Sequence, residues 1–324
     1  MSDQQPGFTR QKCGRGFSYF DTDGQRIRDR QLRDRLKQLA IPPAWKDVWI
    51  CPDERGHLQA TGRDAKGRKQ YRYHPEWRQI RSQVKFDRLV PFGQALSAIR
   101  QQTQEHLALQ GLPREKVLAL VVQLLEETLI RVGNTAYAKA NQSYGLTTLR
   151  TRHLTVEGAQ VEFEFVGKSG VEHHIELADK RLAKVIQRCS ELPGYRVFQY
   201  LDDNGQRQSV DSADVNDYLQ TIAGDDFTAK DFRTWAGTVL TAQVLRDQPA
   251  EITATPSQQQ ITAAIKTVAQ QLGNRPATCR KYYVHPKVPD TYLEGQLFSV
   301  MQSPCRAIKH LDRSECAVLA LLAT

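Results

Sequence analysis

Several side chains in four short segments belong to types that could bind a phosphate and attack it. In chain order they are Arg131, Lys168, Arg233, Asn274 and the adjacent pair Tyr282 and Tyr283. A guanidinium pairs with two phosphate oxygens and keeps its proton at neutral pH. A phenol becomes a useful nucleophile only where its surroundings favour the phenolate.

Each of these residues also has an ordinary structural explanation. An arginine after an apolar helix often caps its last carbonyls, and a lysine in a turn is usually only solvated. Arg233 lies beside Trp235, against which it could stack, and the tyrosines could simply pack. The sequence has no GxxxxGK[ST] phosphate loop and no HExxH metal motif. His173 and His174 are adjacent on a predicted strand and should face opposite ways, which argues against a shared metal.

Basic and aromatic residues also alternate in one stretch near the start of the chain. The residues there that could contact nucleic acid are Lys66, Arg68, Gln70, Tyr71 and Tyr73. Lysine and arginine supply phosphate contacts, while glutamine and tyrosine can reach bases or sugars. If 69–73 is a strand, Tyr71 and Tyr73 share one face and Gln70 points to the other. The alternative is a packed strand with solvated basic side chains.

The charge of the chain is concentrated in its first quarter. The formal net charge is +9, and residues 1–90 hold 20 Lys+Arg against 11 Asp+Glu, whereas residues 91–324 are balanced. A basic module on a neutral body suits an anionic polymer such as nucleic acid, although a solvated basic surface is the alternative. The six cysteines show no CxxC pair and are expected to be reduced thiols. The polar start and the lack of a long apolar run argue against a secretory signal and a membrane span.

The patterning predicts an α+β protein with two domains. Residues 1–90 are expected to form a small β-rich domain with one helix at 27–39 and a hairpin around 63–68. Residues 91–324 are expected to be mostly helical with one small sheet. The predicted helices are 96–107, 114–134, 178–191, 212–222, 228–247 and 256–272, followed by 276–283 and an apolar C-terminal helix within 304–323. We expect this last helix to pack onto the second domain.

Taken in order, these segments resemble the type IB DNA topoisomerases of the bacterial and poxvirus-like branch. The resemblance runs from about residue 16 to 290 and includes the stretch 60–71. It implies that Arg131, Lys168, Arg233 and Asn274 surround a scissile phosphate and that Tyr283 attacks it. The interval of nine residues from Asn274 to Tyr283 fits the family pattern and favours Tyr283 over Tyr282. Asn274 stands where some relatives have histidine.

The implied activity is relaxation of positive and negative supercoils without metal, ATP or any other cofactor. Two guanidiniums would stabilise the pentavalent transition state, and Asn274 would donate one further hydrogen bond. Lys168 would protonate the leaving 5′-oxygen. The product would be a 3′-phosphotyrosyl enzyme that religates after the free end has swivelled.

The resemblance also implies a clamp of two domains around duplex DNA. Gln70, Tyr71 and Tyr73 would contact DNA from the first domain, and Asn134 and Tyr137 from the second. A monomer in the cytoplasm, associated with the nucleoid, is the expected form.

Two other functions remain open at this point. A tyrosine recombinase shares the Arg, Lys, Arg and Tyr chemistry, but recombinases commonly carry His-x-x-Arg at the second arginine, where this chain has Lys230. A DNA-binding protein without catalysis would explain the basic first domain but not the complete set of five site residues.

Overall fold

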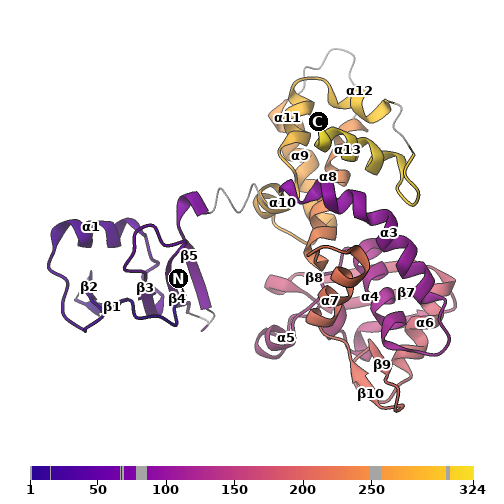
Figure 1. The fold of residues 1–324 in the computed structure, drawn as a ribbon, viewed down its shortest axis with the longest axis horizontal. Coiled ribbons are helices and arrows are strands. Elements are labelled where there is room, and N and C mark those ends of the chain that lie inside the picture. Colours follow the sequence, from indigo (N-terminus) through magenta and orange to yellow (C-terminus); the bar gives the residue numbers. More distant parts are fainter. Residues whose placement is uncertain are drawn as a thin grey trace. The chain divides into compact units, whose positions relative to one another are not determined.

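A computed structural model describes residues 2–14, 16–65, 67, 69–77, 86–247, 257–303 and 307–324. The chain divides into two compact units, Met1–Phe86 and Asp87–Thr324. Both units mix helices with sheet, and the second is mostly helical, which confirms the α+β class (Figure 1). The division falls at 86/87, close to the expected domain limit at 90. Lys66 and Arg68, two expected DNA contacts, lie outside the described residues.

The first unit is an antiparallel sheet with one helix. The strands lie in the order β2-β1-β3-β4-β5. Their bounds are Phe8–Cys13 for β1, Gly16–Phe20 for β2, Lys46–Ile50 for β3, Leu58–Arg63 for β4 and Lys69–Tyr73 for β5. The predicted hairpin is confirmed, because β4 pairs with β5 from Arg63↔Lys69 onward.

The helix of this unit, α1 (Arg30–Gln38), starts three residues later than the predicted one. Asp29 caps it by accepting a hydrogen bond from the Leu32 amide at 2.6 Å, which is the usual role of aspartate at this position. Leu36 is fully buried and packs with Val48, Ile50 and other sheet residues in a single apolar cluster. The helix therefore covers one face of the sheet.

The second unit is mostly helical and contains a three-stranded antiparallel sheet. The helices are α3 (Leu89–Leu107), α4 (Arg114–Thr128), α5 (Thr135–Asn141), α6 (Lys180–Ser190), α7 (Ser212–Ala223), α8 (Ala229–Arg246), α9 (Gln258–Gln271), α10 (Pro276–Tyr283), α11 (Lys287–Leu293), α12 (Leu297–Gln302) and α13 (Arg313–Ala323). The sheet has the order β6-β7-β8, with bounds Leu154–Glu157, Gln160–Val166 and Glu172–Ala178. A separate pair, β9 (Gln199–Leu201) and β10 (Arg207–Ser209), completes the unit.

Helix α8 is the centre of the second unit. It packs against α3, α4, α9, α10, α11, α12 and α13. Most of its residues are buried, including the polar Thr234, Thr238 and Thr241, and these three hydroxyls donate to carbonyls one turn earlier. A helix buried on several sides is rigid, so the side chains it carries are well positioned.

The C-terminal helix α13 packs on α3 and α8, as expected. Its Glu315 accepts hydrogen bonds from Arg100 of α3 and from the Trp235 indole of α8, the latter at 3.0 Å. Glu126 of α4 also pairs with Arg100. Because all four groups are largely buried, this network ties four helices together.

Two further expectations can be compared with the structure. The cysteines that the structure describes are free thiols: Cys13 is exposed, and Cys51, Cys189, Cys279 and Cys316 are buried. Within the described parts of the chain, none of the helices combines the length and apolarity that crossing a bilayer requires.

Candidate active site

Arg131 lies in a non-helical segment between α4 and α5. The predicted helix 114–134 is wrong in this respect, because α4 ends at Thr128 and Leu129 adopts a left-handed conformation with φ of 54°. The Arg131 carbonyl accepts a hydrogen bond from the Leu146 amide at 2.9 Å, and the Val132 carbonyl accepts one from Thr147 at 2.8 Å. These contacts hold the backbone of Arg131 against the segment that precedes the sheet.

Arg233 occupies the first turns of α8 and is only 4% exposed. Its guanidinium donates to the carbonyl of Leu129 and, at 2.6 Å, to that of Leu272. Arg233 therefore caps the end of α4 and joins it to the end of α9. The end of α4 is thus capped by Arg233, whereas the sequence had suggested Arg131 as the residue that could cap it.

Asn274 comes shortly after the end of α9, separated from it by Leu272 and Gly273. The amide of Gly273 donates to the carbonyl of Gln270 and that of Asn274 to Ala269, the two hydrogen bonds of a Schellman motif. Gly273 has φ of +56°, a conformation that glycine adopts without strain. The end of α9 thus sets the position of Asn274 next to the start of α10.

The side-chain amide of Asn274 is oriented by Arg131. The Arg131 guanidinium donates to the Asn274 Oδ1 and, at 3.2 Å, to the Gly273 carbonyl. Since a guanidinium can only donate, the amide oxygen must face it and the NH2 group must face away. That Nδ2 is buried and has no hydrogen-bond partner among the described residues, and the same holds for the Arg233 Nε. Two buried donors are thus available to a ligand oxygen.

Tyr283 is the last residue of α10 and is half-buried beside Arg233. The guanidinium carbon of Arg233 lies 5.3 Å from the centre of the Tyr283 ring. The Tyr283 carbonyl accepts a hydrogen bond from the Thr238 hydroxyl at 3.3 Å. A Cβ on Gly237 would lie 2.5 Å from that carbonyl oxygen, so the glycine lets α10 approach α8 closely. By contrast, the neighbouring Tyr282 is 41% exposed.

The electrostatics of this group favour an anion. Burial and the charge of Arg131 lower the pKa of Arg233 to about 10, while the charge of a Tyr283 phenolate would raise it. Burial also lowers the pKa of Arg131. Both arginines remain protonated at neutral pH, and their mutual repulsion would be relieved by a phosphate or a phenolate. The structure thus brings Arg131, Arg233, Asn274 and Tyr283 together.

Lys168 is placed differently from the other four. It lies exposed in the turn Lys168–Gly170 that joins β7 to β8. The turn is closed by a hydrogen bond from the Gly167 amide to the Val171 carbonyl at 2.7 Å, and Ser169 and Gly170 both have positive φ. Among the described residues the ammonium makes no hydrogen bond or ion pair.

His173 and His174 point to opposite faces of β8, as predicted. His173 stacks on Phe165 with ring centres 4.9 Å apart. Burial, Arg131 and Arg233 together lower the pKa of His173, so its imidazole is neutral and faces the arginines.

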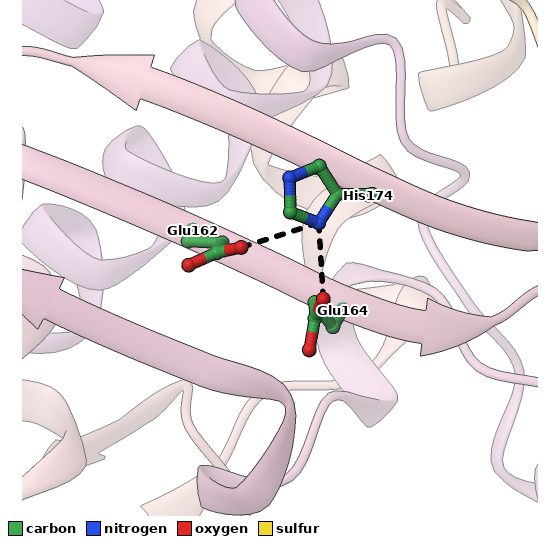
Figure 2. Close-up of side chains that lie close together, drawn as sticks. All are labelled: Glu162, Glu164 and His174. Carbon is green, nitrogen blue, oxygen red and sulfur yellow. Dashed lines mark hydrogen bonds and ion pairs between the residues drawn. The ribbon is translucent and has the colours of Figure 1, made fainter.

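His174 lies on the exposed face among glutamates (Figure 2). It contacts Glu162 at 3.2 Å, Glu164 at 3.0 Å and Glu176 at 3.2 Å, and the carboxylates raise its pKa. Ligand atoms of Glu162, Glu164 and His174 lie within 4.8 Å of one another. These side chains are exposed to solvent and the imidazole already contacts the carboxylates, so the cluster needs no metal ion to explain it.

In the first unit, Tyr71 and Tyr73 share one face of β5, as predicted. Their rings are stacked with centres 6.0 Å apart, and Tyr71 is 47% exposed. The Gln70 amide donates to the Asp64 carboxylate at 2.9 Å across the hairpin. The exposed ring of Tyr71, stacked on the half-buried Tyr73, offers a surface for a sugar or a base.

In the second unit, Asn134 caps α5 by accepting a hydrogen bond from the Tyr137 amide at 2.9 Å. Next to α5 lies a cluster that sequence inspection missed, the Arg150–Arg196 cluster, made of Arg150, Arg152, Tyr195 and Arg196. Arg150 and Arg196 form an isolated β-bridge. Arg196 donates to the Thr135 hydroxyl of α5 at 3.2 Å.

No carboxylate in the described residues forms an ion pair with the three arginines of the Arg150–Arg196 cluster. Tyr195 is 61% exposed, and Arg150 lies 5.4 Å from the centre of its ring. The alternation of Arg150 and Arg152 is visible in the sequence, but the proximity of Arg150 to Tyr195 and Arg196 depends on the fold. Unpaired guanidiniums beside an exposed aromatic ring suit a phosphate backbone.

Comparisons with known proteins cover nearly the whole chain. A family model for the catalytic core of eukaryotic DNA topoisomerase I matches residues 74–297, and one for the N-terminal domain of bacterial DNA topoisomerase IB matches residues 16–64. A DNA topoisomerase 1B of Acanthamoeba polyphaga mimivirus is 32% identical over 303 residues, or 91% of this chain and 90% of that protein. A DNA topoisomerase 1B of vaccinia virus (strain Copenhagen) is 24% identical over 264 residues, or 79% of this chain and 80% of that protein.

Proposed function

Because the chain belongs to the type IB DNA topoisomerases, we propose that its catalytic group consists of Tyr283, Arg131, Arg233, Asn274 and Lys168. One observation carries this assignment: the Tyr283 ring lies against the guanidinium of Arg233, and the buried Arg233 Nε and Asn274 Nδ2 have no hydrogen-bond partner among the described residues. Donors that are held in place before the substrate arrives need no reorganisation when charge develops on a phosphate.

In the proposed reaction the Tyr283 phenolic oxygen attacks one phosphorus atom of a DNA strand. The Tyr–O–P bond forms as the bond to the 5′-oxygen breaks, and the phenolic proton passes to water. Arg131, Arg233 and the Asn274 NH2 group hold the non-bridging oxygens as negative charge increases on them. The broken strand then ends in a 3′-phosphotyrosine and a 5′-hydroxyl.

The reverse step restores the strand after the free end has rotated. The 5′-hydroxyl attacks the phosphotyrosine and releases Tyr283. Because the phosphodiester energy is kept in the covalent link, religation consumes no nucleotide. Torsional strain in the DNA supplies the driving force for swivelling, so both positive and negative supercoils are relaxed.

The activity can be tested with supercoiled plasmid incubated with the protein in EDTA. We expect a ladder of relaxed topoisomers, with the same end products in Mg²⁺, because the proposed chemistry uses only side chains. Adding ATP should change nothing. Plasmid that stays supercoiled in EDTA, with a well-folded sample, would contradict the metal-free mechanism. Activity that requires two aligned DNA sites, with no relaxation of a single circle, would point to a recombinase.

Lys168 is proposed as the general acid that protonates the 5′-oxygen. Its place in a glycine-flanked turn, with no other partner in the described residues, leaves the ammonium able to reach a bound strand. We expect Lys168→Ala to slow cleavage of ordinary DNA by at least ~10²-fold, the usual range for a lost general acid. A substrate with sulfur at the 5′-bridging position should restore the rate, because a thiolate leaves without a proton.

The matched control for this experiment is Lys180→Ala, which removes another exposed lysine of the same unit. It should cleave both substrates at the wild-type rate. A Lys168→Ala variant that is equally slow on both substrates would exclude the proton-donor role while leaving the nucleophile untested.

DNA binding is proposed to use both units. From the first unit we propose Lys66, Arg68, Gln70, Tyr71 and Tyr73 as contacts. From the second we propose Asn134, Tyr137 and the Arg150–Arg196 cluster, whose arginines lie beside α5. With contacts from two units the duplex would be held as in a clamp while one strand swivels. We further propose that the protein acts as a monomer on DNA of the nucleoid, in the cytoplasm.

A further inference from the structure

His173 occupies a slot between two glycines that each precede a residue of the proposed catalytic group. A Cβ on Gly167 would lie 2.6 Å from the His173 Cδ2, and a Cβ on Gly273 would lie 2.4 Å from its Cε1. Gly167 directly precedes Lys168, and Gly273 directly precedes Asn274. The imidazole thus fills the space that separates the lysine turn from the end of α9.

The opposite side of the ring is also held. Phe165 stacks on it with an interplanar angle of 12°, and Phe165 and His173 are paired across β7 and β8. The strand pairing therefore sets where the imidazole lies, and the imidazole in turn limits how the Lys168 turn can approach Asn274. A flat, rigid ring in contact with two backbones leaves little freedom to either of them.

Of the two backbones that the ring contacts, the lysine turn is the less constrained. Gly167, Ser169 and Gly170 surround Lys168, and glycine has more accessible conformations than any other residue. Gly273 is held more firmly, since its amide donates to the Gln270 carbonyl and its own carbonyl accepts from Arg131. The turn also makes few contacts of its own, because its three residues are exposed. Something outside the turn must therefore fix its position relative to the scissile phosphate.

We propose that His173 is a positioning residue for the proton donor: its imidazole wedges between Gly167 and Gly273 and holds Lys168 at the proper distance from the phosphate bound by Asn274, Arg131 and Arg233. The inference rests on the general-acid role proposed for Lys168. His173 itself need not touch the substrate, and it is neutral, so it adds no charge to the site.

The test uses single-turnover cleavage of two duplexes, one ordinary and one with sulfur at the 5′-bridging position. We expect His173→Ala to slow cleavage of the ordinary duplex by ~10-fold or more, in line with the loss caused by misplacing a catalytic group. The sulfur-containing duplex should be cleaved at close to the wild-type rate. In a Lys168→Ala background the His173→Ala change should slow the ordinary duplex no further, because the group it positions is already gone.

His174→Ala is the matched control, since the adjacent imidazole faces solvent on the other side of the strand. It should leave both rates unchanged. If His173→Ala does not fold, His173→Ser also removes the ring and serves for the same comparison, with the melting temperature measured for each variant.

A second variant tests the steric part of the argument. Gly167 has φ of −93°, which alanine tolerates, so Gly167→Ala should be harmful mainly through its contact with the ring. We expect slower cleavage of the ordinary duplex in Gly167→Ala, and partial recovery when His173→Ala is added.

The outcomes separate this inference from the function beneath it. Equal slowing of both duplexes by His173→Ala, or no slowing of either, would overturn the positioning role. If Lys168→Ala is rescued by sulfur and His173→Ala is not, the inference fails while the general acid stands. If Lys168→Ala is not rescued, the general-acid assignment itself fails.

Discussion

Tyr283→Phe is expected to abolish covalent attachment to DNA and all relaxation of supercoiled plasmid. Phenylalanine keeps the ring that lies against Arg233 but lacks the oxygen that would bond to phosphorus. DNA affinity should stay within about threefold of wild type, because basic side chains supply most of the binding energy. The free energy of unfolding should change by less than about 1.5 kcal/mol, the usual upper value for one hydrogen bond.

The measurement is the transfer of a labelled DNA strand to the protein, followed by denaturing electrophoresis. Tyr282→Phe is the matched control, since it removes the same atom from the adjacent and more exposed residue. It should form adducts at the wild-type rate. Adducts in Tyr283→Phe together with their loss in Tyr282→Phe would move the nucleophile by one residue and contradict the site described here.

Loss of either arginine of the site should slow cleavage by more than ~10²-fold, the usual effect of removing one donor from a transition-state oxyanion. Arg131→Ala removes a cation and also the group that orients the Asn274 amide. Arg233→Ala removes the cation that lies against Tyr283. The rate of adduct formation under single-turnover conditions measures both effects.

Arg233 needs a folding control, because its side chain also holds the fold. Its removal leaves the carbonyls of Leu129 and Leu272 without their donor, at a cost of about 1–3 kcal/mol each. Arg233→Lys keeps the positive charge and a donor for a carbonyl, so the variant should stay folded. Its single ammonium lacks the planar fork that spans two carbonyls and a phosphate, so cleavage should remain slow. Arg181→Ala, on the exposed face of α6, should behave as wild type. Folded Arg131 and Arg233 variants that cleave within ~10-fold of wild type would remove both cations from the mechanism.

The elements that carry the site were predictable because their signals are local. Helix α10 begins at Pro276 after the Gly273 break and ends at Tyr283, as the sequence indicated. The hairpin of β4 and β5 follows from turn residues between alternating strands. Such features depend on residues within a few positions of one another.

The end of α4 was predicted wrongly for an equally physical reason. The apolar pattern continues past Thr128, but Leu129 turns left-handed and its carbonyl is taken by Arg233, which lies 104 residues away. Nothing in the local pattern indicates a partner at that distance. The Arg150–Arg196 cluster was missed for the same reason, since its two halves are distant in the sequence and are brought together by a β-bridge and the Arg150–Tyr195 contact.

By itself the sequence carried the resemblance to the family, the α+β class, most of the longer helices and five residues whose types suit phosphate chemistry, because short motifs and local patterns are visible without a structure. Only the tertiary structure decided that Arg131 orients Asn274 across 143 residues, that Arg233 caps one helix and lies against the tyrosine at the end of another, and that His173 rather than His174 faces the arginines. A hydrogen bond or a van der Waals contact is decided within a few ångströms of space, and packing alone brings distant parts of a chain that close.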